Sequence, residues 1–172
     1  MRVIGFDPGY GLTGWGVVTP QGIEQNRLYS PGYGVIKTPA TISFAERLVM
    51  IQQQTIELLN EHEPDYAVIE KLFLKNNHKT AAEVYQARGV IMATAAGAGC
   101  QIIELAPNQI KLMVCGHGQA QKVEIERMVK MILNIKEAIK PDDTADALAG
   151  AIVGYNYLKS TQLMSATGVK IL

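Results

Sequence analysis

The fold is decided by one stretch near the start of the chain, Arg2-Val3-Ile4-Gly5-Phe6-Asp7-Pro8-Gly9-Tyr10-Gly11-Leu12-Thr13-Gly14. Its first six residues are mostly apolar and end on a carboxylate, which indicates a buried strand that stops at an acid. Proline and three glycines follow, and these residues mark a turn. A second apolar stretch, residues 15–19, comes after a short connection and therefore predicts an antiparallel partner strand.

The same pattern of an apolar strand that ends on an acid returns at Asp65-Tyr66-Ala67-Val68-Ile69-Glu70. Ligand sites in open sheets lie outside strand ends, and a carboxylate held there by a buried strand is preorganised. A single strand-terminal acid is more often an exposed residue with no special role. Two in one small chain favour a functional site that contains Asp7 and Glu70.

The remaining pattern places further elements around these two strands. A strand is predicted at residues 28–37, with a bulge or irregular start at Pro31 and Gly32, and another at 101–105. Helical spacing predicts helices at residues 41–62, 79–98, 119–133 and 142–158, and a short one that begins at Pro107. This order predicts an α/β fold, a five-stranded mixed sheet flanked by helices on both faces, although several folds share it. Residues 1–160 then form one domain, and residues 161–172 a C-terminal tail without clear period.

Composition restricts the class of protein. The chain has 172 residues of which 48% are hydrophobic, enough for one globular core and too apolar for disorder. Two cysteines are too few for a disulfide framework, so a reduced, cytoplasmic compartment is expected. The longest apolar stretch, residues 90–100, is about half of the ~20 residues that a membrane span needs, and the first residues do not have the pattern of a signal peptide. We therefore expect no membrane association.

Charge points to an anionic partner. The formal net charge is zero, which disfavours a tail-driven nucleic-acid binder. Residues 71–136 nevertheless hold nine Lys and Arg against four Asp and Glu. A basic middle between acidic flanks favours an anion bound there, although chance alone would explain such a bias in a small chain.

A third acidic feature opens the last predicted helix, Asp142-Asp143-Thr144-Ala145-Asp146. Asp143 and Asp146 share a helix face because they are three residues apart. Helix capping accounts for Asp142, but less well for Asp146, which lies deeper among Ala and Leu. Grouping these acids with Asp7 and Glu70 would be repulsive without cations, and oxygen ligands suit Mg²⁺ or Mn²⁺. Two such ions activate water in phosphodiester hydrolysis.

Five blocks of the sequence, taken together, resemble a known family. They are Phe6-Asp7-Pro8-Gly9 with Thr13-Gly14-Trp15-Gly16-Val17, then Ile69-Glu70, then Gln86-Ala87-Arg88-Gly89-Val90, then Ile110-Lys111 with Gly116, Gly118 and Lys122, and finally Ala145-Asp146-Ala147-Leu148-Ala149. In this order and spacing they resemble the RuvC family of crossover junction endodeoxyribonucleases. Residues 20–34 and the tail depart from the pattern.

The resemblance implies a ribonuclease-H-like fold and a homodimer that resolves Holliday (four-way) DNA junctions by symmetric nicking in homologous recombination and DNA repair. It implies two Mg²⁺ per active site, with Mn²⁺ as a substitute. The catalytic and metal-binding roles fall on Asp7, Glu70, Asp143 and Asp146, and some members have His in place of Asp143. It further implies a branch-migration motor complex of the RuvA and RuvB type as partner.

Basic and aromatic residues near the acids predict DNA contacts. In the segment after Glu70, Phe73 is placed to stack on a base, and Lys75 and Lys79 to bind phosphates, unless Phe73 packs under its own loop. Lys111 and Lys122 flank Gly116-His117-Gly118, which resembles the phosphate-contacting segment of the family. Solvated lysines are the alternative at both places.

Three other functions stay open at this point. The Asp-Pro-Gly turn also resembles a phosphate loop of actin-like sugar kinases, but those enzymes need two such halves. A second nuclease alternative is the shorter group of RuvC-like resolvases that acts in RNA processing. A non-catalytic junction-binding protein would need no intact acid set. Mg²⁺-dependent cutting of a synthetic four-way junction, compared with linear duplex, separates these functions.

Overall fold

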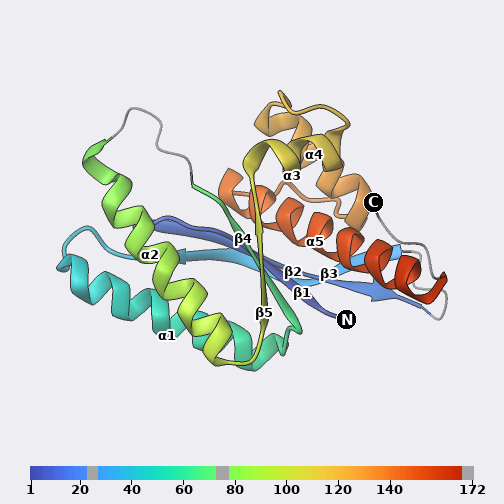
Figure 1. Cartoon of the computed structure of the whole chain (residues 1–172). Helices are drawn as coiled ribbons and strands as arrows, with labels where there is room; N and C mark the ends of the chain where they lie inside the picture. The colour runs from blue at the N-terminus through green and yellow to red at the C-terminus, as the bar shows by residue number, and fades with distance from the viewer. Residues whose placement is uncertain (23–26, 73–77, 168–172) are drawn as a thin grey trace.

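The structure is a computed structural model that describes residues 1–22, 27–72 and 78–167. Its sheet has five strands in the order β3-β2-β1-β4-β5, with β1 (Val3–Asp7) in the centre (Figure 1). β2 (Leu12–Gln21) and β3 (Arg27–Lys37) continue antiparallel on one side, whereas β4 (Tyr66–Glu70) and β5 (Gln101–Leu105) run parallel to β1 on the other. The predicted mixed sheet is confirmed.

Helices cover both faces of the sheet, as Figure 1 shows. α1 (Phe44–His62) and α2 (His78–Gly97) lie on one face. α3 (Pro107–Cys115), α4 (Lys122–Leu133) and α5 (Asp142–Thr167) lie on the other. Side chains of β1 alternate between two cores: Val3 packs in the layer of α3 to α5, while Ile4 and Phe6 pack in the layer of α1 and α2. Within the described ranges, no helix is both long and apolar enough to cross a membrane.

Glycines let α5 rest directly on the sheet. A Cβ atom added to Gly5 of β1 would lie 2.1 Å from the carbonyl oxygen of Ala147, and one added to Gly14 of β2 would lie 2.0 Å from that of Asp143. Neither position has room for a side chain. The Thr144 hydroxyl, which is fully buried, donates to the carbonyl of Gly34 at 3.2 Å and fixes the first turn of α5 on β3 as well.

Two local predictions have different outcomes. The bulge expected near Pro31 is confirmed, because the register shifts where Val17 pairs with Gly32 and Thr19 pairs with Tyr29. The expected end of the last helix near residue 158 was wrong, since α5 continues to Thr167. Ser160 and Thr161 donate their hydroxyls to the carbonyls four residues earlier and so stay compatible with the helix. The division into a domain and a tail stays a prediction.

Candidate active site

The alternation of strand side chains brings Asp7 and Glu70 to the same face. In β1, Asp7 follows Val3 and Gly5 on the side that faces α5, and in β4, Glu70 follows Val68 on that side. The two strands are parallel neighbours, and the last paired residues are Phe6 and Ile69. Asp7 and Glu70 therefore end adjacent strands side by side, as the sequence predicted.

α5 brings its acids over these strand ends. Gly14 is paired with Asp7 across β1 and β2, and the backbone of Asp143 lies against that same glycine. Asp146 is one turn further along the helix, with a side chain that is 20% exposed. The close approach of helix and sheet thus gathers acids from three elements at one end of the molecule.

The carboxylates lie close enough to repel one another, as the shifts of their pKa values indicate. Burial raises the pKa of Asp7 well above its ordinary value, and Glu70, Asp146 and Asp143 raise it further, against a lowering by Lys122. Burial and Asp146 raise the pKa of Glu70 to about 7. The pKa of Asp146 is also raised, chiefly by burial and then by Asp143. Such mutual repulsion is what a bound cation would relieve.

Two of the predicted lysines lie beside the acids. The Lys122 ammonium, at the start of α4, is 3.7 Å from Asp142 and 4.0 Å from Asp146. Lys111 of α3 lowers the pKa of both Glu70 and Asp146 by its positive charge. Asp142, which the sequence indicated only as a helix cap, therefore also holds Lys122 near the site.

The turn after Asp7 is fixed by its own hydrogen bonds. The Thr13 hydroxyl, on a fully buried residue, donates to the carbonyl of Gly9 at 2.6 Å and accepts from the Gly9 amide at 3.2 Å. A Cβ atom at Gly9 would lie 2.2 Å from the carbonyl oxygen of Leu12. The backbone beyond Asp7 is thus held in one conformation, which preorganises that carboxylate.

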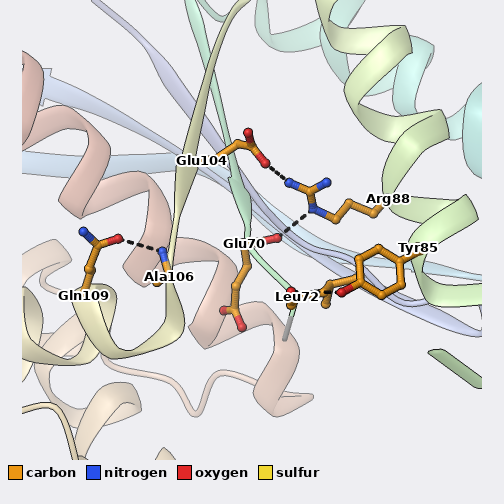
Figure 2. Close-up of polar contacts among 7 residues, drawn as sticks. All are labelled: Glu70, Leu72, Tyr85, Arg88, Glu104, Ala106 and Gln109. Atoms are coloured by element: carbon orange, nitrogen blue, oxygen red, sulfur yellow. Dashed lines mark hydrogen bonds and ion pairs between the residues drawn. The ribbon is translucent and has the colours of Figure 1, made fainter. Parts of the chain in front are cut away.

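The strand end at Glu70 is held by two residues that the sequence did not assign to the site, Arg88 and Glu104. Figure 2 shows Arg88 of α2 beside the backbone carbonyl of Glu70, to which its Nε donates at 3.0 Å. The same guanidinium pairs with the Glu104 carboxylate of β5. Tyr85, one turn earlier in α2, donates its hydroxyl to the carbonyl of Leu72 at 3.1 Å. In the sequence Arg88 stood in an Ala-rich helical stretch and in one of the five family blocks, but neither indicated this contact.

The other predicted DNA contacts cannot be placed in the same way. Phe73 and Lys75 lie outside the described residues. Lys79 lies in the first turn of α2, but its side chain is outside the described part.

The donor set fits a hard divalent cation in its chemistry. Asp7, Glu70 and Asp146 offer oxygen donors, are largely removed from water, and repel one another. In the described part of the chain, however, no three Asp, Glu, His or Cys side chains are arranged as a ready cation site. The residue types and their electrostatics support a metal site, and the side chains would have to converge further to close around an ion.

A mixed sheet in the order β3-β2-β1-β4-β5, with carboxylates brought from two strand ends and one helix, defines a nuclease of the ribonuclease-H-like class. Comparison with known proteins is more specific. The family model described as "Crossover junction endodeoxyribonuclease RuvC" matches residues 3–154. The chain therefore belongs to the RuvC family of crossover junction endodeoxyribonucleases.

Individual relatives agree with this assignment over nearly the whole chain. The RuvC of Halothermothrix orenii is 42% identical over 152 residues, which are 88% of this chain and 90% of that protein. The RuvC of Syntrophomonas wolfei is 38% identical over 170 residues, 99% and 97% of the two chains. The structure of Thermus thermophilus RuvC in complex with a Holliday junction substrate has a TM-score of 0.85 at 33% identity, covering 94% and 96% of the chains.

Proposed function

We propose that this chain is a Holliday junction resolvase that cuts four-way DNA junctions by symmetric nicking in recombination and repair, with Asp7, Glu70, Asp143 and Asp146 as its catalytic and metal-binding residues. The observation that carries the proposal is the group of partly buried, mutually repelling carboxylates at the adjacent ends of β1 and β4 under α5. Without a cation this arrangement costs stability, so a function must maintain it.

The chain's own residues orient the reacting groups. When two Mg²⁺ or Mn²⁺ ions are bound, they supply activation of water and stabilisation of the leaving oxygen in phosphodiester hydrolysis. Asp7 and Glu70 give fixed carboxylates because rigid strands carry them. Asp143 and Asp146 close the site from the helix, and their position depends on the contact between α5 and the sheet.

Basic residues around the acids suit a phosphodiester substrate. Lys111 and Lys122 lie on the same side as the carboxylates, where they would bind the phosphates that flank the cut. Phe73, Lys75 and Lys79 follow Glu70 in the sequence and would meet the DNA next to the site. Phe73 would stack on a base near the junction centre, where bases are partly unstacked.

The decisive experiment compares wild type with Asp7→Asn on a synthetic four-way junction and on linear duplex, in Mg²⁺. Wild type should nick the junction symmetrically. Asp7→Asn keeps the size of the side chain but removes a charged ligand, so cutting should fall by at least ~100-fold while junction binding is kept or tightened. Normal cutting by the variant at saturating Mg²⁺ contradicts the site assignment. Cutting of RNA alone would favour the RNA-processing alternative.

Phe73→Ala and Lys75→Ala separate stacking from phosphate binding. Stacking is worth roughly 1–3 kcal/mol per base, and we expect it to be used in the cutting step, so Phe73→Ala should slow cleavage with junction affinity nearly kept. Lys75→Ala should weaken binding and reduce its salt dependence. Both rate and affinity are measured for each variant. A lower melting temperature with intact cleavage would instead make Phe73 a packing residue.

The functional unit we propose is a cytoplasmic homodimer that works with a branch-migration motor complex of the RuvA and RuvB type. Two equivalent sites suit the two symmetric strands of a junction. A groove between α1 and α2 supports the dimer, because apolar residues line it on the face of the sheet opposite the acids, among them Leu48, Val49, Ile56 and Val90.

A further inference from the structure

The peptide unit between Glu70 and Lys71 is fixed at both of its polar groups. The amide of Lys71 donates to the carbonyl of Leu105 in β5 at 2.8 Å. The carbonyl of Glu70 accepts from Nε of Arg88 at 3.0 Å. Because a peptide unit is planar, two bonds in opposite directions determine its orientation and with it the direction in which the Glu70 side chain leaves the backbone.

The Glu70 carbonyl needs a side-chain donor such as arginine, because the neighbouring strand β1 has no backbone N–H to donate to it. Pairing between β1 and β4 ends at Phe6 and Ile69. The next amide beyond Asp7 on β1 would belong to Pro8, which has no N–H to donate. The turn that follows Asp7 thus removes a backbone donor next to Glu70, and a side chain of α2 supplies one instead.

The guanidinium is held in place by a second partner. Glu104 is paired with Ile69 across β4 and β5, so its carboxylate stands on the α2 face of the sheet, beside the Glu70 backbone. Its ion pair with Arg88 orients the planar guanidinium group toward that carbonyl. The Arg88 side chain is only 14% exposed, and both Nε and Nη2 are engaged within the protein. Figure 2 shows the Glu70 carboxylate pointing away from Arg88.

We infer that Arg88 is a positioning residue of the nuclease site: together with Glu104 it holds the end of β4 from the α2 face, so that Glu70 is presented to the opposite face in one orientation. This inference rests on the proposed function, because it takes Glu70 to be a metal ligand. In this inference Arg88 acts through the backbone of Glu70, because the bonds of its guanidinium go to the Glu70 carbonyl and the Glu104 carboxylate.

The test uses the full chain and three variants. Arg88→Gln removes the anchor, Glu104→Gln removes the charge of its partner but leaves Arg88, and Tyr85→Phe removes a neighbouring bond from α2 to Leu72. We measure the single-turnover cleavage rate, junction affinity in Ca²⁺, Mn²⁺ binding by calorimetry without DNA, and hydrogen exchange of the Lys71 amide. A misplaced ligand costs on the order of 10²-fold in rate.

For Arg88→Gln we expect cleavage about 10- to 100-fold slower, weaker Mn²⁺ binding and faster exchange at Lys71, with junction affinity within about two-fold of wild type. Glu104→Gln should lie between this variant and wild type, and Tyr85→Phe should stay close to wild type. Wild-type cleavage and Mn²⁺ binding by Arg88→Gln overturn the inference. So does a loss of junction affinity that matches the loss of rate, which would make Arg88 a DNA contact.

Two further variants keep the result interpretable. If Arg88→Gln does not fold, Arg88→Lys keeps the charge beside Glu104 but lacks Nε–H, and slower cleavage at an unchanged melting temperature supports the inference, whereas wild-type cleavage overturns it. Glu70→Gln reports on the proposed function. If it cuts normally, the ligand assignment fails, and if it is inactive while Arg88→Gln is normal, only the role of Arg88 fails.

Discussion

At the scale of single residues, the site is a set of carboxyl groups held close together and partly out of water, where their ionisation lowers the stability of the folded protein. Glu70 illustrates this, since burial and the nearby Asp146 carboxylate raise its pKa to about 7 from an ordinary value of 4.5, while Lys111 and Lys122 offset only part of the cost. In the metal-free protein the folded state therefore binds this proton more tightly than the unfolded chain does. The stability of the protein depends on pH for that reason.

The sign of the pH dependence follows from these two values. Between pH 4.5 and about 7 the folded state holds more protons, so the contribution of Glu70 is most favourable at low pH and is lost as the pH rises. The loss amounts to at most about 3 kcal/mol. We predict that the melting temperature of metal-free protein falls between pH 5 and 8, and that Glu70→Gln reduces this fall.

Thermal melts in EDTA across this range provide the measurement. Glu57→Gln, on the exposed part of α1, is the matched control and should keep the wild-type profile. Adding Mg²⁺ should raise the melting temperature more at pH 8 than at pH 5, because the ligands must lose their protons to bind. An identical pH profile for wild type and Glu70→Gln would contradict the coupling.

At the scale of elements, one helix decides whether the acids meet. α5 lies on β1 and β2 with backbone against backbone, and the contact at Gly14 fixes the height of Asp143 above Asp7. The helix cannot move away by the width of a methyl group without carrying both of its acids with it. The glycine positions are therefore part of the machinery of the site.

Gly14→Ala tests this dependence. The added Cβ would lie 2.0 Å from the Asp143 carbonyl oxygen, so the helix must shift. We predict a loss of about 1–3 kcal/mol in unfolding free energy and a loss of cutting larger than stability alone would cause. Gly11→Ala, just before β2, is the control, because a Cβ atom there meets nothing within 4 Å. Equal effects of the two substitutions, measured by denaturant unfolding and single-turnover cleavage, would refute the prediction.

The sequence predicted the helices and strands that have a strong apolar periodicity. It did not predict contacts between residues that are far apart in the chain. Asp7 and Glu70 were found because apolar strands lead directly to them. Arg88 was not assigned to the site, because its partner carbonyl is 18 residues away and leaves no side-chain signal. The end of α5 was misplaced because Ser160 and Thr161 interrupt the apolar pattern, although they satisfy their hydroxyls within the helix.

At the scale of the whole molecule, the two faces of the sheet differ in the surface that their helices present. The acids and lysines gather on the side of α3 to α5, whereas the groove between α1 and α2 is apolar. Val49 is 51% exposed and Ile56 is 43% exposed, and both line that groove. Pairing through an apolar surface on the opposite face would leave both sites of the proposed two-fold dimer open to DNA.

Val49→Glu should separate the proposed dimer, because it would bury a charge in the apolar interface that we place at this groove. We predict that this variant sediments as a monomer at micromolar concentration. The two strands of a junction should then be nicked independently rather than together. Val123→Glu on α4 is the control: Val123 is 75% exposed and lies outside this groove, so that variant should remain dimeric. A dimer in both variants would place the interface elsewhere.

The contact between α5 and β1 also has a consequence for how the protein is made. β1 precedes α5 by more than 130 residues in the sequence, so β1 leaves the ribosome well before the helix that lies directly on it. A nascent chain that stops before residue 142 lacks Asp143 and Asp146 and leaves the α5 side of its central strand uncovered. Chain order therefore keeps the acids that we propose as catalytic apart until α5 has been made, and we expect products truncated before residue 142 to be inactive on a four-way junction.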